Sequence, residues 1–463
     1  MNNRSFLVLS LTAVVFAPAL RASAQEPAQV FTRPRTVAAA QQTPPPAAAR
    51  PSPTPTPRPV TPPVGTQTTA PPQTTAAPQL PAAAQPTQPT PTAAELAFVG
   101  AAPLQPAKPM PVAKFRLRTA DAQRQLKSRL QLTSMTPPTN TVTVAALDPD
   151  SSQIHLLTLF KDTFLKRGNE VYTTTSLGTH VRLQVVRSNY VNTALVISDP
   201  KGRQLTPLVV EYPIEKGGRF REMAYYTSAH PSLMSPDVVK HGKDYVRNML
   251  DLAAGRLKDK GKVIAPEIVD IAERLCIVEH VDHDRFRRED RGRLYEEIYG
   301  LFGLNELDTY RYSVSSAGAG GMVQMIPSTY AMVRRMHPAV GLNPDFVLGM
   351  RNHGNALEAM LLYMQDTWND MALREEILEA LRTNMATRPE LMAAGYNSNP
   401  ARLPLYLRRG GNGWRSLIPR ETQMYLQIYS SVESLVQFKN RGSDPKPALT
   451  QPAPAATVTS PRD

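Results

Sequence analysis

The pattern of hydrophobic and polar residues divides the chain into four segments. Residues 25–112 contain few large apolar side chains, whereas residues 113–235 carry short alternating runs that are typical of strands. From residue 236 to residue 440, apolar positions recur every three or four residues, as in helices packed on one face. The pattern predicts an α+β protein: a disordered Pro-rich tether, a small α+β module, an all-α domain, and a disordered tail at 441–463.

Within the small module, alternating runs predict several strands joined by turns. The turn sequence Asp199-Pro200-Lys201-Gly202 indicates a hairpin between the runs on either side of it. Apolar spacing predicts helices at 119–132 and 154–166. The predicted strands are 141–144, 180–185, 194–197 and 208–210. No motif in this module indicates a role for it.

Capping residues mark where the helices of the C-terminal half begin. Ser235 can cap a helix that starts with Pro236 and runs to residue 256. The next helix begins near Pro266 and carries Ile268, Ile271, Leu275 and Val278 on one face, which is the spacing of a buried helix. Further helices are predicted at 294–302, 328–336, 356–369, 373–381 and 421–438.

The N-terminus resembles a secretory signal. Arg4 precedes an apolar run at 6–20, and Ala22-Ser23-Ala24 has the small-x-small pattern of a cleavage site. Residues 1–24 are therefore predicted to be a signal peptide, which becomes an anchor if it is not removed. No later segment has the length of a spanning helix, so we expect no membrane span after cleavage. The expected location is the periplasm, the cell envelope or the medium.

Composition agrees with an exported protein. Residues 25–112 are dominated by Pro, Ala, Thr and Gln, which bury too little surface to fold, so they should act as a semi-extended tether. The formal charge of +13 suggests anionic cell-envelope polymers as partners. Nucleic acid is not expected, because no basic segment is interleaved with aromatic residues. The single cysteine, Cys276, lies between Leu275 and Ile277 and is predicted to be buried.

The most specific stretch is Gly-rich and covers residues 312–330. Its core, Ser315-Ser316-Ala317-Gly318-Ala319-Gly320-Gly321-Met322-Val323-Gln324-Met325-Ile326-Pro327-Ser328-Thr329, resembles the Ser-x-x-Gly-Ala-x-Gly-Leu-Met-Gln-x-Met-Pro-x-Thr signature of soluble lytic transglycosylases, the goose-lysozyme-like glycosidases. Glycines here let the backbone approach a sugar ring closely, while Ser315 and Gln324 can offer hydrogen bonds.

Later stretches are similar to other family motifs and follow in the family's order. Ala393-Ala394-Gly395-Tyr396-Asn397 looks like the Ala-Tyr-Asn element, and Glu421-Thr422-Gln423-Met424-Tyr425 resembles the Glu-Thr-x-x-Tyr helix start. Residues 355–364 are similar to a supporting helix, so the resemblance covers 265–436. The sequence departs from the family at Ser398-Asn399-Pro400 and in having Gly-Met-Val-Gln. The resemblance implies that substrate is bound by Ser315, Gly321, Met322, Gln324, Tyr396 and Asn397.

Two glutamates compete for the role of catalytic acid. Protonation of a glycosidic oxygen needs a carboxylic acid that stays protonated, and burial disfavours the charged form. Glu279 closes the apolar run 271–278, whereas Glu306 follows Gly303-Leu304-Asn305, which reads as a helix stop and a turn. Family spacing points to Glu306 and apolar context points to Glu279. We rank Glu279 first, with residues 282–310 as an insertion and His280 where the family has Ser.

The resemblance implies a lyase that needs no metal or cofactor. In the family, one Glu acts as acid and then as base while the 6-hydroxyl of muramic acid attacks its own anomeric carbon, leaving a 1,6-anhydromuramoyl end on the peptidoglycan glycan strand. A lysozyme-like hydrolase, with Asp282 or Asp284 as second carboxylate, is the first alternative. A catalytically idle wall-binding or scaffolding protein is the second. His280, Asp282, His283 and Asp284 are interpreted as a polar loop rather than a metal site.

Overall fold

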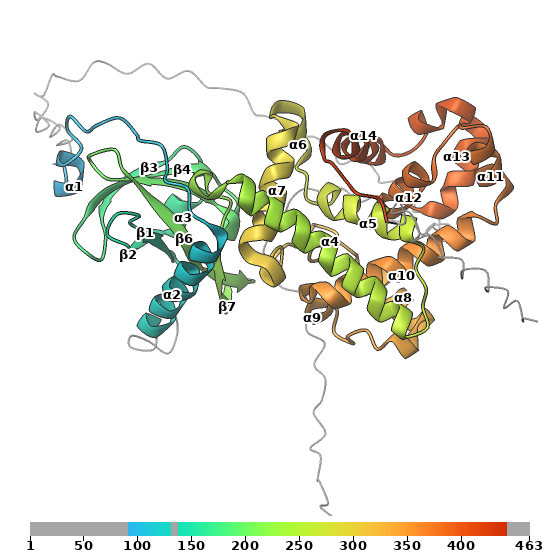
Figure 1. Ribbon diagram of the computed structural model, residues 1–463, viewed down its shortest axis with the longest axis horizontal. Coiled ribbons are helices and arrows are strands. Elements are labelled where there is room, and N and C mark those ends of the chain that lie inside the picture. Colours follow the sequence, from blue (N-terminus) through green and yellow to red (C-terminus); the bar gives the residue numbers. More distant parts are fainter. Residues whose placement is uncertain (1–90, 131–137, 442–463) are drawn as a thin grey trace, which may run out of the picture.

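The computed structural model describes residues 91–130 and 138–441 (Figure 1). The predicted signal peptide, residues 25–90 of the predicted tether and residues 442–463 of the predicted tail lie outside the described residues. A sheet module lies beside a larger helical region, and α4 and α7 lie at the boundary between them (Figure 1). Among the helices of the described residues, none combines the length and apolar character needed to cross a membrane.

The sheet module is built on a seven-stranded antiparallel sheet. The strands follow the order β2-β1-β6-β5-β4-β3, and β7 pairs with β6. The amide of Ser176, after β3, donates to the Leu156 carbonyl of β2 at 3.0 Å, so the two ends of the sheet meet and the sheet curls into a near-barrel. The strands are β1 (Thr141–Leu147), β2 (Ile154–Phe160), β3 (Glu170–Thr174), β4 (His180–Arg187), β5 (Ala194–Ser198), β6 (Gln204–Lys216) and β7 (Arg219–Tyr226).

The predicted fold class, with a small α+β module, is therefore wrong. The module is dominated by its large sheet, and its helices are α2 (Val112–Leu130) on one side and the short α3 (Lys161–Phe164). The predicted helix at 154–166 is strand β2 followed by α3. Ile154 and Leu157 have the spacing of a helix, but β2 pairs with β1 along its whole length, and this tertiary pairing decides the conformation.

The four strand predictions are confirmed, although two strands besides β2 were missed. The predicted runs lie in β1, β4, β5 and β6, and the Gly202 amide closes the β5–β6 turn by donating to the Asp199 carbonyl at 2.9 Å. Strands β3 and β7 were not predicted. Strand β7 reads Arg-Phe-Arg-Glu-Met-Ala-Tyr-Tyr, and its charged residues hide the alternation that marks the other strands.

Residues 91–111, which the sequence assigns to the tether, lie against the sheet module. They begin with the single-turn helix α1 (Ala93–Leu96). The Ala102 amide then donates to the Pro200 carbonyl at 3.0 Å, and the Gln105 amide donates to the Gly202 carbonyl at 2.8 Å. A Cβ on Gly202 would lie 2.0 Å from the Pro103 carbonyl oxygen. Backbone hydrogen bonds hold this segment, which apolar content alone does not predict.

The C-terminal half is helical, as predicted. Every predicted helix is present, and α5 is buried along nearly its whole length in the centre of the region. Cys276, on this helix, is buried as predicted, and burial raises the pKa of its thiol. The helices are α4 (Pro236–Asp259), α5 (Pro266–Val278), α6 (His283–Arg288), α7 (Arg291–Asn305), α8 (Pro327–Met336), α9 (Phe346–Arg351), α10 (His353–Met371), α11 (Glu375–Arg382), α12 (Arg388–Asn397), α13 (Leu403–Gly410) and α14 (Arg420–Leu435).

The sheet module and the helical region share apolar cores. Leu301 of α7 and Tyr312 belong to the core cluster of the sheet, and Val238 of α4 packs in the cluster under α2. Polar contacts supplement this packing: the Asn305 side chain donates to the Thr227 carbonyl at 2.8 Å and accepts from the Thr227 amide at 2.9 Å. The two parts are therefore packed as one body.

Candidate active site

Glu279 lies where two adjoining pockets meet. It is the C-cap residue of α5, and its amide donates to the Leu275 carbonyl at 3.0 Å, which continues the helical hydrogen bonding to its end. The residue is only 8% exposed. Because α5 is buried in the helical core, its end places Glu279 in the linings of both pockets.

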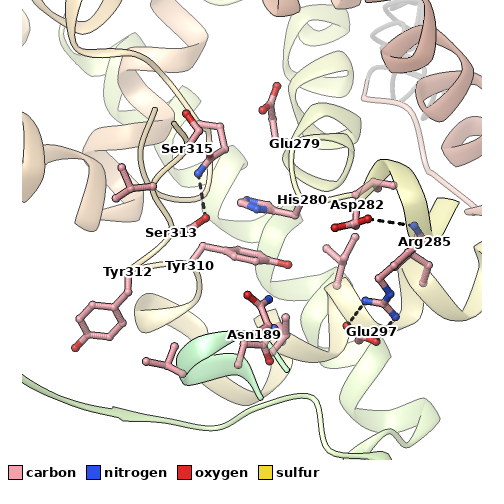
Figure 2. A pocket seen from close by; sticks show the side chains of 18 of the residues that line it. Asn189, Glu279, His280, Asp282, Arg285, Glu297, Tyr310, Tyr312, Ser313 and Ser315 are labelled. Carbon is pink, nitrogen blue, oxygen red and sulfur yellow. Dashed lines mark hydrogen bonds and ion pairs between the residues drawn. The ribbon is translucent and has the colours of Figure 1, made fainter. Parts of the chain in front are cut away.

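One of these pockets lies between the sheet module and the helical region, and we call it the sheet-side pocket. Its empty volume is about 1200 Å³. Asn189 and Tyr226 come from the sheet module, whereas Glu279, Asp282 and Tyr310 come from the helical side. Figure 2 shows Asn189 on one wall and Glu279 at the opposite end. The sequence did not predict that the sheet module contributes to this site.

The second pocket, the helical pocket, is lined by residues of the helical region alone. Its empty volume is about 1120 Å³, and its lining includes Glu279, Gln324, Tyr396, Asn397 and Thr422. Glu279 and Gln324 line both pockets, so the two pockets adjoin at these side chains, and we call the pair of pockets the groove. A groove with a buried carboxyl group at its middle suits an extended ligand that is attacked internally.

Tyr425 holds the Glu279 carboxyl group. Its hydroxyl donates a hydrogen bond to Glu279 Oε1 at 2.6 Å, and both residues are buried. Tyr425 comes from α14, so the contact joins the two ends of the region that carries the motif resemblance. This tyrosine belongs to the Glu421–Tyr425 stretch of the motif resemblance, and no role was predicted for it from the sequence.

Glu306, the alternative acid, lies in a different environment. Its side chain is 41% exposed and forms an ion pair with Arg116 of α2. It also contacts His241 Nε2 of α4 at 2.9 Å. Glu306 is absent from the linings of the two pockets that contain Glu279. The arrangement is that of a carboxylate that ties α2 and α4 to the end of α7.

Two residues of the Gly-rich stretch serve packing rather than either pocket. Gly321, at φ 67°, lies so close to α9 that a Cβ would be 2.3 Å from the Met350 carbonyl oxygen. Met322 is fully buried in the helical core. Neither residue lines the sheet-side or the helical pocket. The glycine at this position is explained by the close approach of backbone to backbone.

Ser315 and Gln324 do line the groove. Ser315 Oγ accepts a hydrogen bond from the Ala319 amide at 3.0 Å, so it shapes the loop from the wall of the sheet-side pocket. Gln324 has a left-handed backbone, at φ 47°, and its Nε2 donates to the Gly321 carbonyl at 2.8 Å. The same nitrogen lies 3.3 Å from Ser313 Oγ. The Gln324 amide is thereby fixed in the lining that it shares with Glu279.

Tyr396 and Asn397 line the helical pocket at the end of α12. The Tyr396 hydroxyl donates to the Val323 carbonyl at 2.7 Å, which ties α12 to the Gly-rich stretch. Asn397 Oδ1 accepts from Thr422 Oγ1 at 2.9 Å. The three motif regions therefore meet at one pocket through direct hydrogen bonds.

The polar loop after Glu279 is held by its own contacts. His280 Nε2 lies 2.9 Å from the Met322 carbonyl, and its ring stacks on Tyr310 with centroids 3.4 Å apart and planes 2° apart (Figure 2). Asp282 caps α6, and Asp284 pairs with Arg287 at 2.9 Å. Across residues 91–130 and 138–441, no cluster of three or more potential metal ligands is found.

The groove thus brings Glu279 together with Gln324, Tyr396 and Asn397, and leaves out Glu306, Gly321 and Met322. Tyr425 lines neither pocket but bonds the Glu279 carboxyl group. Such an arrangement offers one buried carboxyl group beside amide and hydroxyl groups that can orient a neutral polar ligand. Comparison of the chain with family models, with curated proteins and with solved structures finds no match.

Proposed function

We propose that this protein is an exported peptidoglycan lytic transglycosylase that uses Glu279 as its acid and base. The observation that carries the proposal is the position of Glu279, buried at the end of α5 and shared by two pockets of one groove. The substrate would be the glycan strand, and the bond cleaved would be the β-1,4 bond between N-acetylmuramic acid and N-acetylglucosamine.

The chemistry follows from the carboxyl group and its neighbours. A strand lying along the groove presents a glycosidic oxygen to Glu279, which donates its proton to the leaving oxygen. The carboxylate then accepts the proton of the 6-hydroxyl of muramic acid as that oxygen attacks the anomeric carbon. The reaction consumes no water, and the product carries a 1,6-anhydro ring. The Tyr425 hydroxyl, 2.6 Å from Oε1, keeps the carboxyl group oriented through both steps.

Substrate binding in this proposal is divided between the walls of the helical pocket. Gln324, Tyr396 and Asn397 are the residues of the motif resemblance that line it. Gly321 and Met322 would act indirectly, by fixing the backbone that carries Gln324. Ser315 belongs to the other side of the groove, where it shapes the loop.

The same geometry disfavours the hydrolytic alternative. A hydrolase needs a second carboxylate to activate water. Asp282 lines the sheet-side pocket, but its carboxylate accepts from the amides of Asp284 and Arg285 at 3.0 and 3.1 Å. Asp284 also lines this pocket, but it is exposed and paired with Arg287. Asp282 is engaged in capping α6, and Asp284 is engaged by Arg287. These contacts favour the reaction that uses a single acid.

A digest of purified peptidoglycan, followed by mass spectrometry of the soluble products, tests the proposal. The expected products carry 1,6-anhydromuramoyl ends. The E279Q variant should lose activity by about 100-fold or more, since general acid catalysis contributes that much. The matched control is E306Q, which alters a glutamate outside both pockets and should stay active. Reducing ends would indicate a hydrolase, and intact strands would indicate a binding protein.

A further inference from the structure

The charged side chains of the sheet-side pocket are engaged by protein partners rather than left for a ligand. The Arg285 guanidinium donates to both carboxylate oxygens of Glu297, at 2.9 and 2.8 Å (Figure 2). Arg187 of β4 pairs with the same carboxylate, and Asp282 caps α6. A charged ligand would have to compete with these pairs. The pocket therefore suits a neutral ligand that carries polar groups.

The remaining surface of this pocket is mixed in the way expected of a sugar-binding site. Apolar and aromatic side chains such as Ile298, Leu301 and Tyr310 line it beside the polar groups. Sugar rings offer apolar faces and polar edges, and pockets that bind such ligands combine apolar walls with a few placed hydrogen-bonding groups. The pocket adjoins the helical pocket at Glu279 and Gln324, which line both, so a strand bound at Glu279 has both pockets next to it.

Asn189 supplies a hydrogen-bonding group from the sheet module. It precedes the short 3-10 helix Tyr190–Asn192 and lines the sheet-side pocket (Figure 2). Within the part of the chain that the structure describes, its side-chain amide makes no hydrogen bond, whereas its backbone amide donates to Thr193 Oγ1 at 3.0 Å. An amide side chain can both donate and accept, which matches the hydroxyl and acetamido groups of an N-acetylated sugar.

The loop that carries Asn189 is fixed relative to the helical region. Asn192 Oδ1 accepts from the Ala229 amide at 3.2 Å and from Arg187 at 3.1 Å. Arg187 in turn pairs with Glu297 of α7, whose other partner, Arg285, lies on α6. A group held in place before the ligand arrives binds it at a lower entropic cost.

We infer that the sheet module is part of the glycan-binding groove and that Asn189 contacts a sugar residue bound beyond those that flank Glu279. Long strands would then bind more tightly than short ones, because only they reach the sheet module. This inference rests on the proposed function, since it takes the occupant of both pockets to be one N-acetylated glycan strand. The sheet module would thereby make binding selective for long glycan strands.

Binding measurements on an uncleaving protein test the inference. The probes are β-1,4-linked oligomers of N-acetylglucosamine with two and six residues, titrated by calorimetry into the full chain carrying E279Q. Adding N189A should weaken hexamer binding by about tenfold, the loss of one hydrogen bond to a fixed group, and leave dimer binding unchanged. The matched control is N140A, at an exposed asparagine of the same module that lines neither pocket.

The outcomes separate this inference from the proposed enzymatic activity. Unchanged hexamer affinity in N189A overturns the inference, and so does an equal loss for dimer and hexamer, because the amide would then act at the cleavage point or through the fold. Failure of the N140A control to bind the hexamer also overturns it. If the wild-type protein leaves peptidoglycan intact while N189A still loses hexamer affinity, the activity is refuted and the binding site stands.

Discussion

Tyr425 and Tyr429 lie one turn apart on α14 and differ in what their hydroxyl groups contact. Tyr425 donates to Glu279 Oε1 at 2.6 Å, whereas the Tyr429 hydroxyl is buried without a hydrogen-bond partner among the described residues. We predict that Y425F lowers kcat on peptidoglycan by about tenfold, because one hydrogen bond to the reacting carboxyl group is lost. The initial rate of release of soluble fragments measures it.

The Y429F variant is the control for that experiment. Removing a buried hydroxyl group without a partner should leave activity unchanged and raise the free energy of unfolding by about 1 kcal/mol. Equal losses of activity in both variants would mean that α14 affects the site through packing alone, and would refute the positioning role of Tyr425.

His230 makes the stability of the sheet module depend on pH. It is fully buried next to β5, and burial, followed by the nearby charge of Arg187, lowers its pKa from 6.5 to about 3. The unfolded chain therefore takes up a proton near pH 6.5, and the folded chain does so only near pH 3. The stabilising contribution is complete above pH 6.5 and is lost progressively as the pH falls towards 3.

Replacing His230 by Asn tests this dependence, since an amide oxygen can still accept from the Leu195 amide, which lies 3.0 Å from Nδ1 in the native protein. Between pH 7 and pH 4.5, we expect the wild-type protein to lose about 2 to 3 kcal/mol more unfolding free energy than H230N. Urea unfolding at the two pH values provides the measurement. Parallel curves for the two proteins would show that His230 does not titrate as described.

Sequence reasoning found those site residues that a motif names directly and missed those that only the fold brings in. Gln324, Tyr396 and Asn397 come from the resemblance and line the helical pocket. Gly321 and Met322 come from the same motif, but a motif does not say whether a residue meets ligand or core. Asn189 reaches the groove only because the sheet packs on α7, and no local pattern encodes that contact.

Elements were predictable where local pattern and tertiary environment agree. The predicted helices of the C-terminal half show capping residues or apolar positions every three or four residues, which are local signals. All of the predicted helices are present. Strand β2 was mistaken for a helix because its apolar residues suit either conformation until β1 pairs with it. Near-barrel closure through Ser176 and Leu156 depends on contacts between the ends of the sheet, which no window of sequence contains.

The crossing of α4 and α7 depends on glycine. A Cβ on Gly242 would lie 1.8 Å from the Tyr299 carbonyl oxygen, and a Cβ on Gly303 would lie 2.3 Å from the Val238 carbonyl oxygen. The two helices therefore approach backbone to backbone. We predict that G242A lowers the free energy of unfolding by about 3 kcal/mol, since the backbone must shift to admit the methyl group. Thermal and urea unfolding measure the change.

Gly255 on the same helix is the matched control. A Cβ there meets nothing within 4 Å, so G255A should stabilise the protein by up to about 1 kcal/mol through its higher helix propensity. A gain in stability for G242A would show that α4 and α7 are free to separate, contrary to the close crossing.

At the scale of the whole molecule, the boundary between the two parts is apolar core rather than a linker. Leu301 belongs to the sheet cluster although it lies on α7, and Val238 of α4 packs with Phe115 of α2 and Val209 of β6. The segment between β7 and α4 is short, so the chain passes directly from one part to the other. Packing of this kind couples the position of Asn189 to that of Glu279.

The shared core predicts that the sheet and the helices unfold in one transition. Both tryptophans, Trp368 and Trp414, lie in the helical region, so their fluorescence reports on it alone, while hydrogen exchange of β1 and β6 amides reports on the sheet. The two urea midpoints should coincide. The L301A variant should lower both midpoints together, because it opens a cavity in the core that joins the two parts. We expect the free energy of unfolding to fall by about 2 to 5 kcal/mol. Loss of sheet protection at lower urea than the fluorescence change would mean that the groove can lose one wall while its acid stays in place.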